Sequence, residues 1–255
     1  MMNEDQVNGN YPYQTKAKER HGTYGQNKQR AELGAQALCR NSIAVYKTDK
    51  KLVELRDKLN PSFWGNYAEL HGHADVDGNG KVYSNIGVVL YDYSNGTGNN
   101  TVKVYVNVTP EDIYWLYNAL TSHTENFELE QTKIFGQPDN NGYSQMTKLR
   151  IARAGVDKNG AVRRYPWCIS AENGVGIAQH TKIGGTYCKS GSYQSIRKAF
   201  INLSDYDFFR LINRTVRYIA QFENTYCPPI IGDGRIAYGQ MLMQRQMANN
   251  PTQYR

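Results

Sequence analysis

Alternating hydrophobic and polar residues dominate the middle of this 255-residue chain and predict antiparallel β-strands. The segment TVKVYVNV, at 101–108, alternates strictly, as a strand with one buried face does. Other segments rich in Val, Ile and Tyr are expected to be strands: 64–74, 82–93, 143–154, 162–171, 176–183 and 194–203. Turn sequences rich in Asn, Asp and Gly separate several of these segments, which favours hairpin connections.

Two helix starts are predicted directly after strands. In the first, Thr109 supplies a cap, Pro110 suits the first helical position, and acidic residues follow. In the second, Ser204 is the cap of a longer helix with an apolar stripe, and this helix is predicted to end at Cys227, before two prolines. Leucines at helical spacing also predict a short amphipathic helix over 49–59. A further short helix is expected in the tail, over 237–248.

The two strand-helix junctions match each other in register at a constant offset of 95 residues. The matched pairs include Asn107 and Asn202, Thr109 and Ser204, Asp112 and Asp207, and Leu116 and Leu211. Strand, cap and helix phase agree together, which indicates a duplicated unit of antiparallel strands followed by a helix. The alternative is that two unrelated helices use the same favoured capping residues.

The pattern therefore predicts an α+β fold, in which an antiparallel β-meander closed by a helix (ββββα) occurs twice. The expected units are 62–124, with three clear strands, and 141–224, within a domain spanning 46–227. A flexible polar arm is expected at 1–45, because these residues are polar and show no periodicity. The C-terminal tail is expected to begin at 228.

Two copies of a four-stranded antiparallel unit closed by a helix resemble the Whirly proteins. One copy resembles the unit of the dimeric transcriptional coactivator called positive cofactor four. The resemblance covers about 62–224 and rests on topology, repeat and composition, and the Lys-rich motif of plant Whirly proteins has no counterpart in the sequence. It implies single-stranded DNA binding on curved sheets, with bases stacked on aromatic rings and Lys and Arg holding the backbone.

Charge and aromatic content are compatible with such a partner. The chain carries 30 basic and 23 acidic residues, a net charge of +7, and 20 of its aromatic residues are Tyr. The segment 61–140 has three basic and ten acidic residues, whereas 141–227 has thirteen and five. The basic second unit indicates a polyanionic partner, and tyrosine rings suit exposed binding platforms as well as cores.

Binding of single strands without sequence preference needs a positive surface and exposed aromatic faces. The second unit offers both, most densely in the segment Arg163 to Trp167. In the first unit Tyr83, Tyr91 and Tyr93 share one strand face, but basic residues are missing beside them. The predicted nucleic-acid-binding residues are Lys148, Arg150, Arg153, Arg163, Arg164, Tyr165, Trp167, Lys182, Tyr187, Lys189, Tyr193, Arg197 and Lys198.

The leading hypothesis is a non-enzymatic protein of a phage or mobile element that binds single-stranded DNA or RNA, DNA in the first place. It is expected to need no cofactor or metal, to form a homo-oligomer and to be cytoplasmic, with four reduced cysteines and no membrane segment. One alternative is a protein-protein module whose acidic first unit engages a basic partner. Another is a metal-dependent enzyme that uses His71, His73 and Asp75, which share a strand face.

Overall fold

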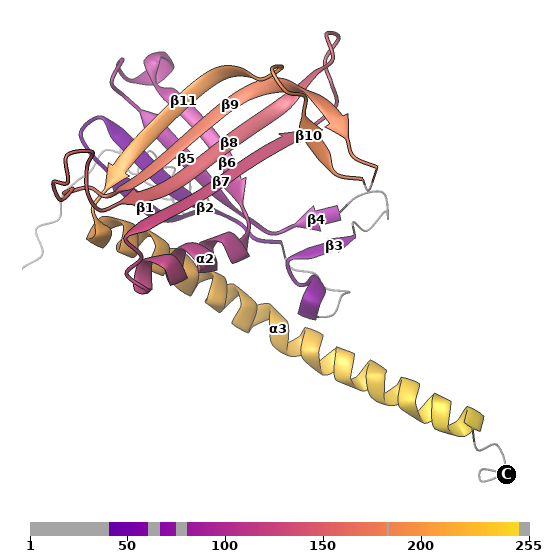
Figure 1. Ribbon diagram of the computed structural model, residues 1–255. Coiled ribbons are helices and arrows are strands. Elements are labelled where there is room, and N and C mark those ends of the chain that lie inside the picture. Colours follow the sequence, from indigo (N-terminus) through magenta and orange to yellow (C-terminus); the bar gives the residue numbers. More distant parts are fainter. Residues whose placement is uncertain (1–40, 61–66, 75–80, 183, 250–255) are drawn as a thin grey trace, which may run out of the picture. The chain divides into compact units, whose positions relative to one another are not determined.

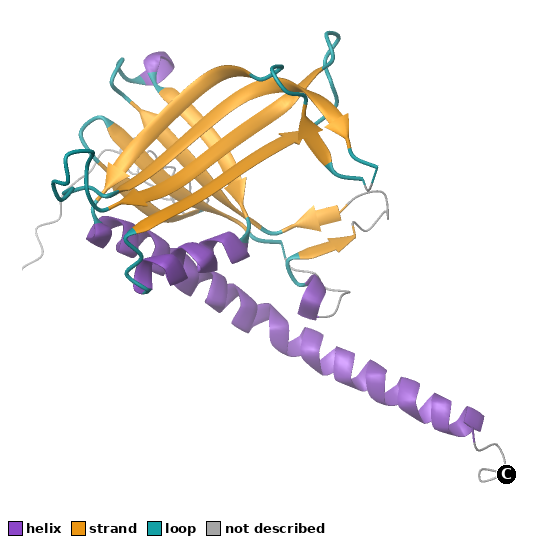
Figure 2. Ribbon diagram, viewed as in Figure 1, coloured by secondary structure: helices purple, strands orange, loops and turns teal. Residues whose placement is uncertain are grey.

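The computed structural model describes residues 41–60, 67–74, 81–182 and 184–249. The segment predicted as a flexible arm, apart from its last residues, lies outside the described part, as does Asp75. The described residues form two large antiparallel sheets, a short two-stranded hairpin and two α-helices (Figures 1 and 2). The expected α+β class, with antiparallel sheets, is confirmed.

Sheet 1 is a four-stranded antiparallel meander that is followed in the chain by a helix. Its strands, in spatial order, are β1 (Ser42–Lys47), β2 (Lys51–Lys58), β5 (Asn85–Asp92) and β6 (Val102–Val108). Between β2 and β5 the chain forms a 3-10 turn, Tyr67–Glu69, and the hairpin of β3 (Gly72–Ala74) and β4 (Lys81–Tyr83). A second 3-10 turn, Gly98–Asn100, precedes β6. Helix α2 (Pro110–Thr121) follows β6.

The predicted helix over 49–59 is wrong, because these residues form strand β2. Leu52, Leu55 and Leu59 have helical spacing, but Val53 and Leu55 also alternate with polar residues at the spacing of a strand. Both Val53 and Leu55 are buried, at 0% and 2% exposure. Sheet 1 thus begins at Ser42, inside the predicted arm, and has four strands rather than three.

Sheet 2 is built around a long central strand that has two partners on one edge. Its strands are β7 (Asn126–Phe135), β8 (Tyr143–Ala154), β9 (Trp167–His180), β10 (Thr186–Cys188) and β11 (Gln194–Leu203). The order is β7-β8-β9, and the far edge of β9 pairs first with β11 and then with β10. The sheet curves strongly over sheet 1 (Figure 2).

Two predictions for this sheet need correction. No strand is predicted between the first helix and Tyr143, but Asn126–Phe135 form strand β7, whose outward face is polar. The second sheet-helix half therefore begins near Asn126 rather than at 141. Separate strands are predicted over 162–171 and 176–183, yet Trp167–His180 form one continuous strand, β9. A Cβ at Gly174, inside this strand, would come within 2.2 Å of the Gln194 carbonyl oxygen. Glycine here permits the close approach of β11.

The hydrophobic core lies between the two sheets and the helices. Side chains that alternate along the inner faces of both sheets meet those of α2 and of α3 (Asp205–Asn249) in one cluster. Among the most buried are Val88, Val104, Val106, Ile151, Ile169, Ile201, Leu116, Leu211 and Phe208. Burial of this continuous apolar surface is the main force that holds the two sheets together.

Both predicted helix starts are confirmed by hydrogen bonds. The Asp112 amide donates to Thr109 Oγ1 at 3.2 Å, and the Thr109 amide donates to Asp112 Oδ2 at 2.8 Å, which completes a capping box. At α3 the Asp207 amide donates to Ser204 Oγ at 3.1 Å. These bonds satisfy backbone N–H groups that a helix start leaves without partners.

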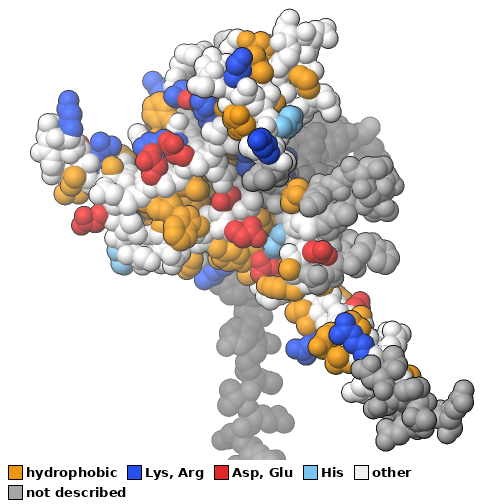
Figure 3. All heavy atoms as spheres, turned by 45° about the vertical axis from the view of Figure 1, so that its right-hand side comes forward, with side chains coloured by type: hydrophobic (Ala, Val, Ile, Leu, Met, Phe, Trp, Pro, Cys, Tyr) orange, Lys and Arg blue, Asp and Glu red, His pale blue; other side chains and the backbone are white. Residues whose placement is uncertain are grey.

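The predicted end of the second helix at Cys227 is wrong, since α3 continues through Pro228 and Pro229 to Asn249. A proline costs a helix about 3 kcal/mol, but Cys227 and Ile230 on either side are buried against Leu70. The short helix predicted in the tail is the end of α3. Hydrophobic and basic side chains lie exposed along it (Figure 3). Among the described residues, no helix combines the length and the apolar character that crossing a membrane requires.

Candidate functional site

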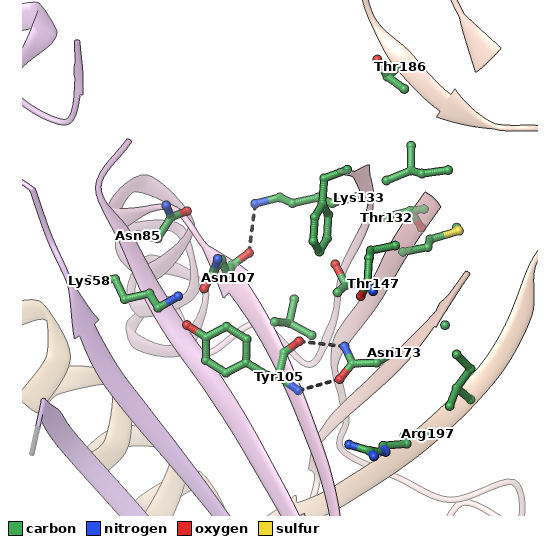
Figure 4. Close-up of a pocket in the computed structure, with 17 residues that line it drawn as sticks. Lys58, Asn85, Tyr105, Asn107, Thr132, Lys133, Thr147, Asn173, Thr186 and Arg197 are labelled. Carbon is green, nitrogen blue, oxygen red and sulfur yellow. Dashed lines mark hydrogen bonds between the residues drawn. The ribbon is translucent and has the colours of Figure 1, made fainter. Parts of the chain in front are cut away.

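A groove of about 980 Å³ opens between the two sheets, beside the core (Figure 4). Strands β2, β5 and β6 supply one wall, and β7 to β11 supply the other. Three cationic side chains line it, Lys58, Lys133 and Arg197, and no carboxylate is present among the described lining residues. Eight more lining residues carry amides or hydroxyls: Asn85, Asn107, Asn173, Gln145, Thr132, Thr147, Thr186 and Tyr105.

Hydrogen bonds from side chains to backbone fix the two walls relative to each other (Figure 4). The Tyr105 amide donates to Asn173 Oδ1 at 2.9 Å, and Asn173 Nδ2 donates to the Tyr105 carbonyl at 2.7 Å. The Asn173 side chain thus pairs with the free edge of β6 as another strand would. Lys133 Nζ donates to the Asn107 carbonyl at 2.9 Å. The groove is therefore bounded by rigid strands, which preorganises it for a ligand.

The three cations of the groove have no carboxylate partner among the described residues. Lys58 Nζ lies 4.5 Å from the centre of the Tyr105 ring, a cation–π contact that leaves its charge uncompensated. Arg197 is exposed at the groove. Unpaired charges of one sign between low-dielectric walls create a positive potential that attracts anions.

Aromatic side chains and unpartnered polar atoms lie in the same groove. Phe135 is 52% exposed, and Tyr105 lies flat against the sheet because Gly87 leaves space for it. A Cβ at Gly87 would come within 2.9 Å of the Tyr105 hydroxyl. That hydroxyl and Asn107 Oδ1 are buried without a hydrogen-bond partner among the described residues. Buried polar atoms normally have partners, so the groove can accept hydrogen bonds from a ligand and donate them to it.

The outer face of sheet 2, opposite the core, carries several of the predicted binding residues, and acids neutralise them. Arg150 is paired with Glu128, and its Nε lies 3.4 Å from Glu130 Oε1. Lys198 Nζ lies 2.6 Å from Glu172 Oε1. The hydrogen bond from Lys198 holds the pKa of Glu172 below its ordinary value, although partial burial opposes this shift. These cations are already engaged within the chain.

Tyr193 and Lys148 belong to the same outer face and are engaged as well. The Tyr193 hydroxyl donates to Glu172 Oε2 at 3.0 Å, and Lys148 Nζ lies 3.6 Å from the centre of the Tyr193 ring. Lys148, Glu172 and Lys198 lie in one row across β8, β9 and β11. A base that stacked on Tyr193 would first have to displace the Lys148 ammonium.

Trp167 lies in the core, which corrects its prediction as a base-stacking residue. Its ring is fully buried and stacks on Phe208 with centroids 4.0 Å apart. Its Nε1 donates to Asp205 Oδ1 at 2.8 Å, and Arg153 Nε donates to the same oxygen at 3.0 Å. Hydrogen bonds from Arg153 hold the pKa of Asp205 below its ordinary value. Trp167 and Arg153 therefore anchor the start of α3 to sheet 2.

The remaining predicted residues are divided between the two ends of β9. Arg163, Arg164 and Tyr165 lie in the 155–166 connection before its first residue, with Tyr165 44% exposed. Lys182, Tyr187 and Lys189 lie around β10, beyond its last residue. A 14-residue strand spans about 45 Å, so the structure does not bring these two groups together. Of the predicted residues, Arg197 lines the groove.

Sequence reasoning missed Lys58, Tyr105, Lys133 and Phe135. Lys58 lies in the segment predicted as a helix and Lys133 in a segment with no predicted strand, so the sequence places neither on a sheet. The alternation in NFELEQTKIF, residues 126–135, was the signal that could have identified β7.

The charge contrast between the two halves also depends on where the boundary is drawn. With the boundary after α2, residues 41–121 carry seven basic and nine acidic groups, and 122–227 carry fourteen and nine.

The predicted metal line gains no support from the described residues. His71 Nε2 lies 3.2 Å from Glu223 Oε1, and the third predicted ligand, Asp75, is outside the described part. No group of three His, Cys, Asp or Glu side chains in the described ranges could hold a metal ion.

Comparison of the chain with family models, with curated proteins and with solved structures found no match. The geometry and charge of the groove therefore carry the functional argument.

Proposed function

We propose that this protein binds single-stranded nucleic acid, DNA in the first place, in the groove between its two sheets, without catalysing a reaction. The observation that carries the proposal is a groove whose described lining holds three unpaired cations and no carboxylate. Anionic phosphates are the polymeric partner that suits such a lining best, because neutralising them releases condensed counterions.

Each kind of side chain in the groove has a role in this proposal. Lys58, Lys133 and Arg197 hold phosphates along the groove. Phe135, with half of its surface exposed, offers a face on which a base stacks, whereas the Lys58 ammonium already lies against the Tyr105 ring. Base stacking contributes about 1–3 kcal/mol per base and tolerates any sequence. The amide and hydroxyl groups add hydrogen bonds to sugars and base edges.

The proposal specifies a single strand because bases must be unpaired to use this site. In a duplex the faces of the bases are covered by their neighbours, and a protein reaches them only after unstacking. Both walls of the groove consist of paired strands, so they present a fixed slot rather than an adaptable loop. A strand with free bases can enter this slot at no unpairing cost.

We further propose that the two sheet-helix halves are copies of one unit, in the arrangement that resembles the Whirly proteins. Positions related by the offset of 95 residues share their burial, which supports this view. The buried pairs are Val104 and Ala199, Val106 and Ile201, Val108 and Leu203, Ile113 and Phe208, and Leu116 and Leu211. Both halves contribute to the groove, so one chain suffices to form it, and a homo-oligomer would only add further surface.

Fluorescence anisotropy of the full chain with labelled oligonucleotides tests the proposed function. Single-stranded DNA or RNA should bind at low salt and compete better than a duplex of the same length. With three phosphate contacts, log K should fall against log salt with a slope of about −2. Absence of binding at low salt, or binding of mononucleotides but not of oligonucleotides, would overturn the proposal.

A further inference from the structure

The face of sheet 1 that points away from the core continues the groove with more aromatic and basic side chains. Strand register places these side chains in parallel rows. The row of Glu54, Val89 and Tyr105 ends at the groove, and the next row is Leu52, Tyr91 and Lys103. Adjacent rows lie about 7 Å apart, two residues along a strand. We call this surface, formed by Arg56, Tyr91, Tyr93 and Lys103, the sheet 1 track.

Two stacked aromatic rings lie beside basic side chains on the track. The Tyr91 and Tyr93 rings are parallel within 5°, with centroids 6.1 Å apart. Lys103 Nζ lies 5.4 Å from the centre of the Tyr91 ring, and Arg56 Nη2 donates to the Tyr91 hydroxyl at 2.8 Å. Lys103 is exposed and has no ion pair among the described residues.

Charge on the track is positive despite one acidic residue. Glu54 Oε2 accepts a hydrogen bond of 2.6 Å from Arg56 Nη2, so its charge is compensated. Arg56 is thus engaged with both Glu54 and Tyr91, which leaves Lys103 as the uncompensated cation of the track. The outer face of sheet 2, by contrast, sets Glu128, Glu130 and Glu172 against its cations.

We infer that a single strand longer than the groove leaves it across the sheet 1 track, and not across the outer face of sheet 2. Its bases stack on Tyr91 and Tyr93, and its phosphates contact Lys103. This inference rests on the proposed function and adds the direction and extent of the bound strand. It makes the site longer than the groove, within the usual range of about 4–16 nucleotides.

The inference predicts an effect that depends on oligonucleotide length. Lys103→Ala should weaken binding of a strand of about sixteen nucleotides roughly fivefold at 0.1 M salt and reduce its salt slope by about 0.7. It should leave binding of a strand of about four nucleotides, held in the groove alone, unchanged. Tyr91→Ala should also weaken the long strand, with little change in slope. Lys158→Ala, which removes an equally exposed lysine in the 155–166 connection, is the matched control.

The outcomes separate this inference from the proposed function. If Arg197→Ala weakens both lengths while Lys103→Ala and Tyr91→Ala weaken neither, the groove binds but the track does not, and the inference fails. The same holds if the track variants weaken both lengths equally, since the short strand should not reach them. If neither length binds the unaltered chain at low salt, the proposed function itself fails. Thermal unfolding of each variant verifies that the fold is intact.

Discussion

The groove and the outer face of sheet 2 carry the same number of cations but differ in how these are paired. Lys58, Lys133 and Arg197 line the groove without a described carboxylate partner. Lys148, Arg150 and Lys198 lie on the outer face, next to three glutamates, and two of them form ion pairs. The number of basic residues therefore does not distinguish the two surfaces, whereas the pairing of their charges does, and it is the basis on which we propose the groove as the binding surface.

The physical reason is that a paired cation has little charge left for a ligand. An exposed ion pair contributes about 0–1 kcal/mol to stability. Before its cation can bind phosphate, the ion pair must break, because otherwise the neighbouring carboxylate repels the phosphate. An unpaired cation between two walls meets neither cost, and the walls strengthen its field. The two surfaces thus provide an internal comparison within one molecule.

The largest effect is expected at Trp167, which sequence reasoning placed on the binding surface. Trp167→Ala should lower the free energy of unfolding by about 3–5 kcal/mol, because it removes a fully buried ring stacked on Phe208. Urea unfolding followed by circular dichroism measures this loss. Oligonucleotide affinity of the fraction that remains folded should not change. An unaltered unfolding midpoint with lost binding would show that the ring serves as a base platform after all.

The next effect is expected from the exposed ring of the groove. Phe135→Ala should weaken oligonucleotide binding by about 1–3 kcal/mol without changing the salt slope, since stacking releases no counterions. Phe200→Ala is the control, because Phe200 is 44% exposed but lies on the outer face of sheet 2, where the Lys51 ammonium is 3.3 Å from its ring centre. Anisotropy titrations at several salt concentrations measure both quantities. Equal losses in the two variants would contradict the assignment of stacking to the groove.

A smaller effect is expected when the glutamates that pair with a cation on the outer face of sheet 2 are neutralised. The double variant Glu128→Gln and Glu130→Gln should free Arg150 from both of its partners. A second, weaker binding phase should then appear at low salt, in the non-specific range of about 10⁻⁴–10⁻⁶ M. The tighter phase, assigned to the groove, should keep its affinity. Stoichiometric titration checks the number of bound strands. An unchanged stoichiometry would show that ion pairing is not what prevents this face from binding nucleic acid.

The smallest effect is expected on stability, from the Lys198–Glu172 pair. Because Lys198 is largely exposed, Lys198→Ala should cost at most about 1 kcal/mol near neutral pH. The pair lowers the pKa of Glu172, so its contribution is present above the ordinary Glu value and is lost as pH falls through the lowered pKa. Unfolding of both proteins across acidic pH should show the difference disappear. A difference that grew on acidification would contradict the direction of this pKa shift.

Local signals predicted the parts of the fold that depend on neighbouring residues. Thr109 with Asp112, and Ser204 with Asp207, marked both helix starts correctly because capping acts over three residues. The helix predicted over 49–59 is wrong because its leucines have helical spacing, while Val53 and Leu55 have the spacing of a strand. Tertiary contacts with β5 decide between these periods.

The groove was hardly predictable, since it joins residues that are distant in the sequence. Lys58 and Arg197 are 139 positions apart, and only the packing of the two sheets places them in one lining. Likewise, the pairing of Arg150 with Glu128 depends on the register of β7 against β8. The spacing of residues along one sequence indicates neither the shared groove lining nor this ion pair.

The most direct test of the central claim compares two double variants that each remove two exposed cations. Lys58→Ala with Arg197→Ala alters the groove, and Arg150→Ala with Lys198→Ala alters the outer face of sheet 2. For single-stranded DNA, the groove variant should lose about 1.4 from the salt slope and bind about 25-fold more weakly at 0.1 M salt. The outer-face variant should match the unaltered protein. Equal losses in both variants, or a loss confined to the outer-face variant, would contradict the account.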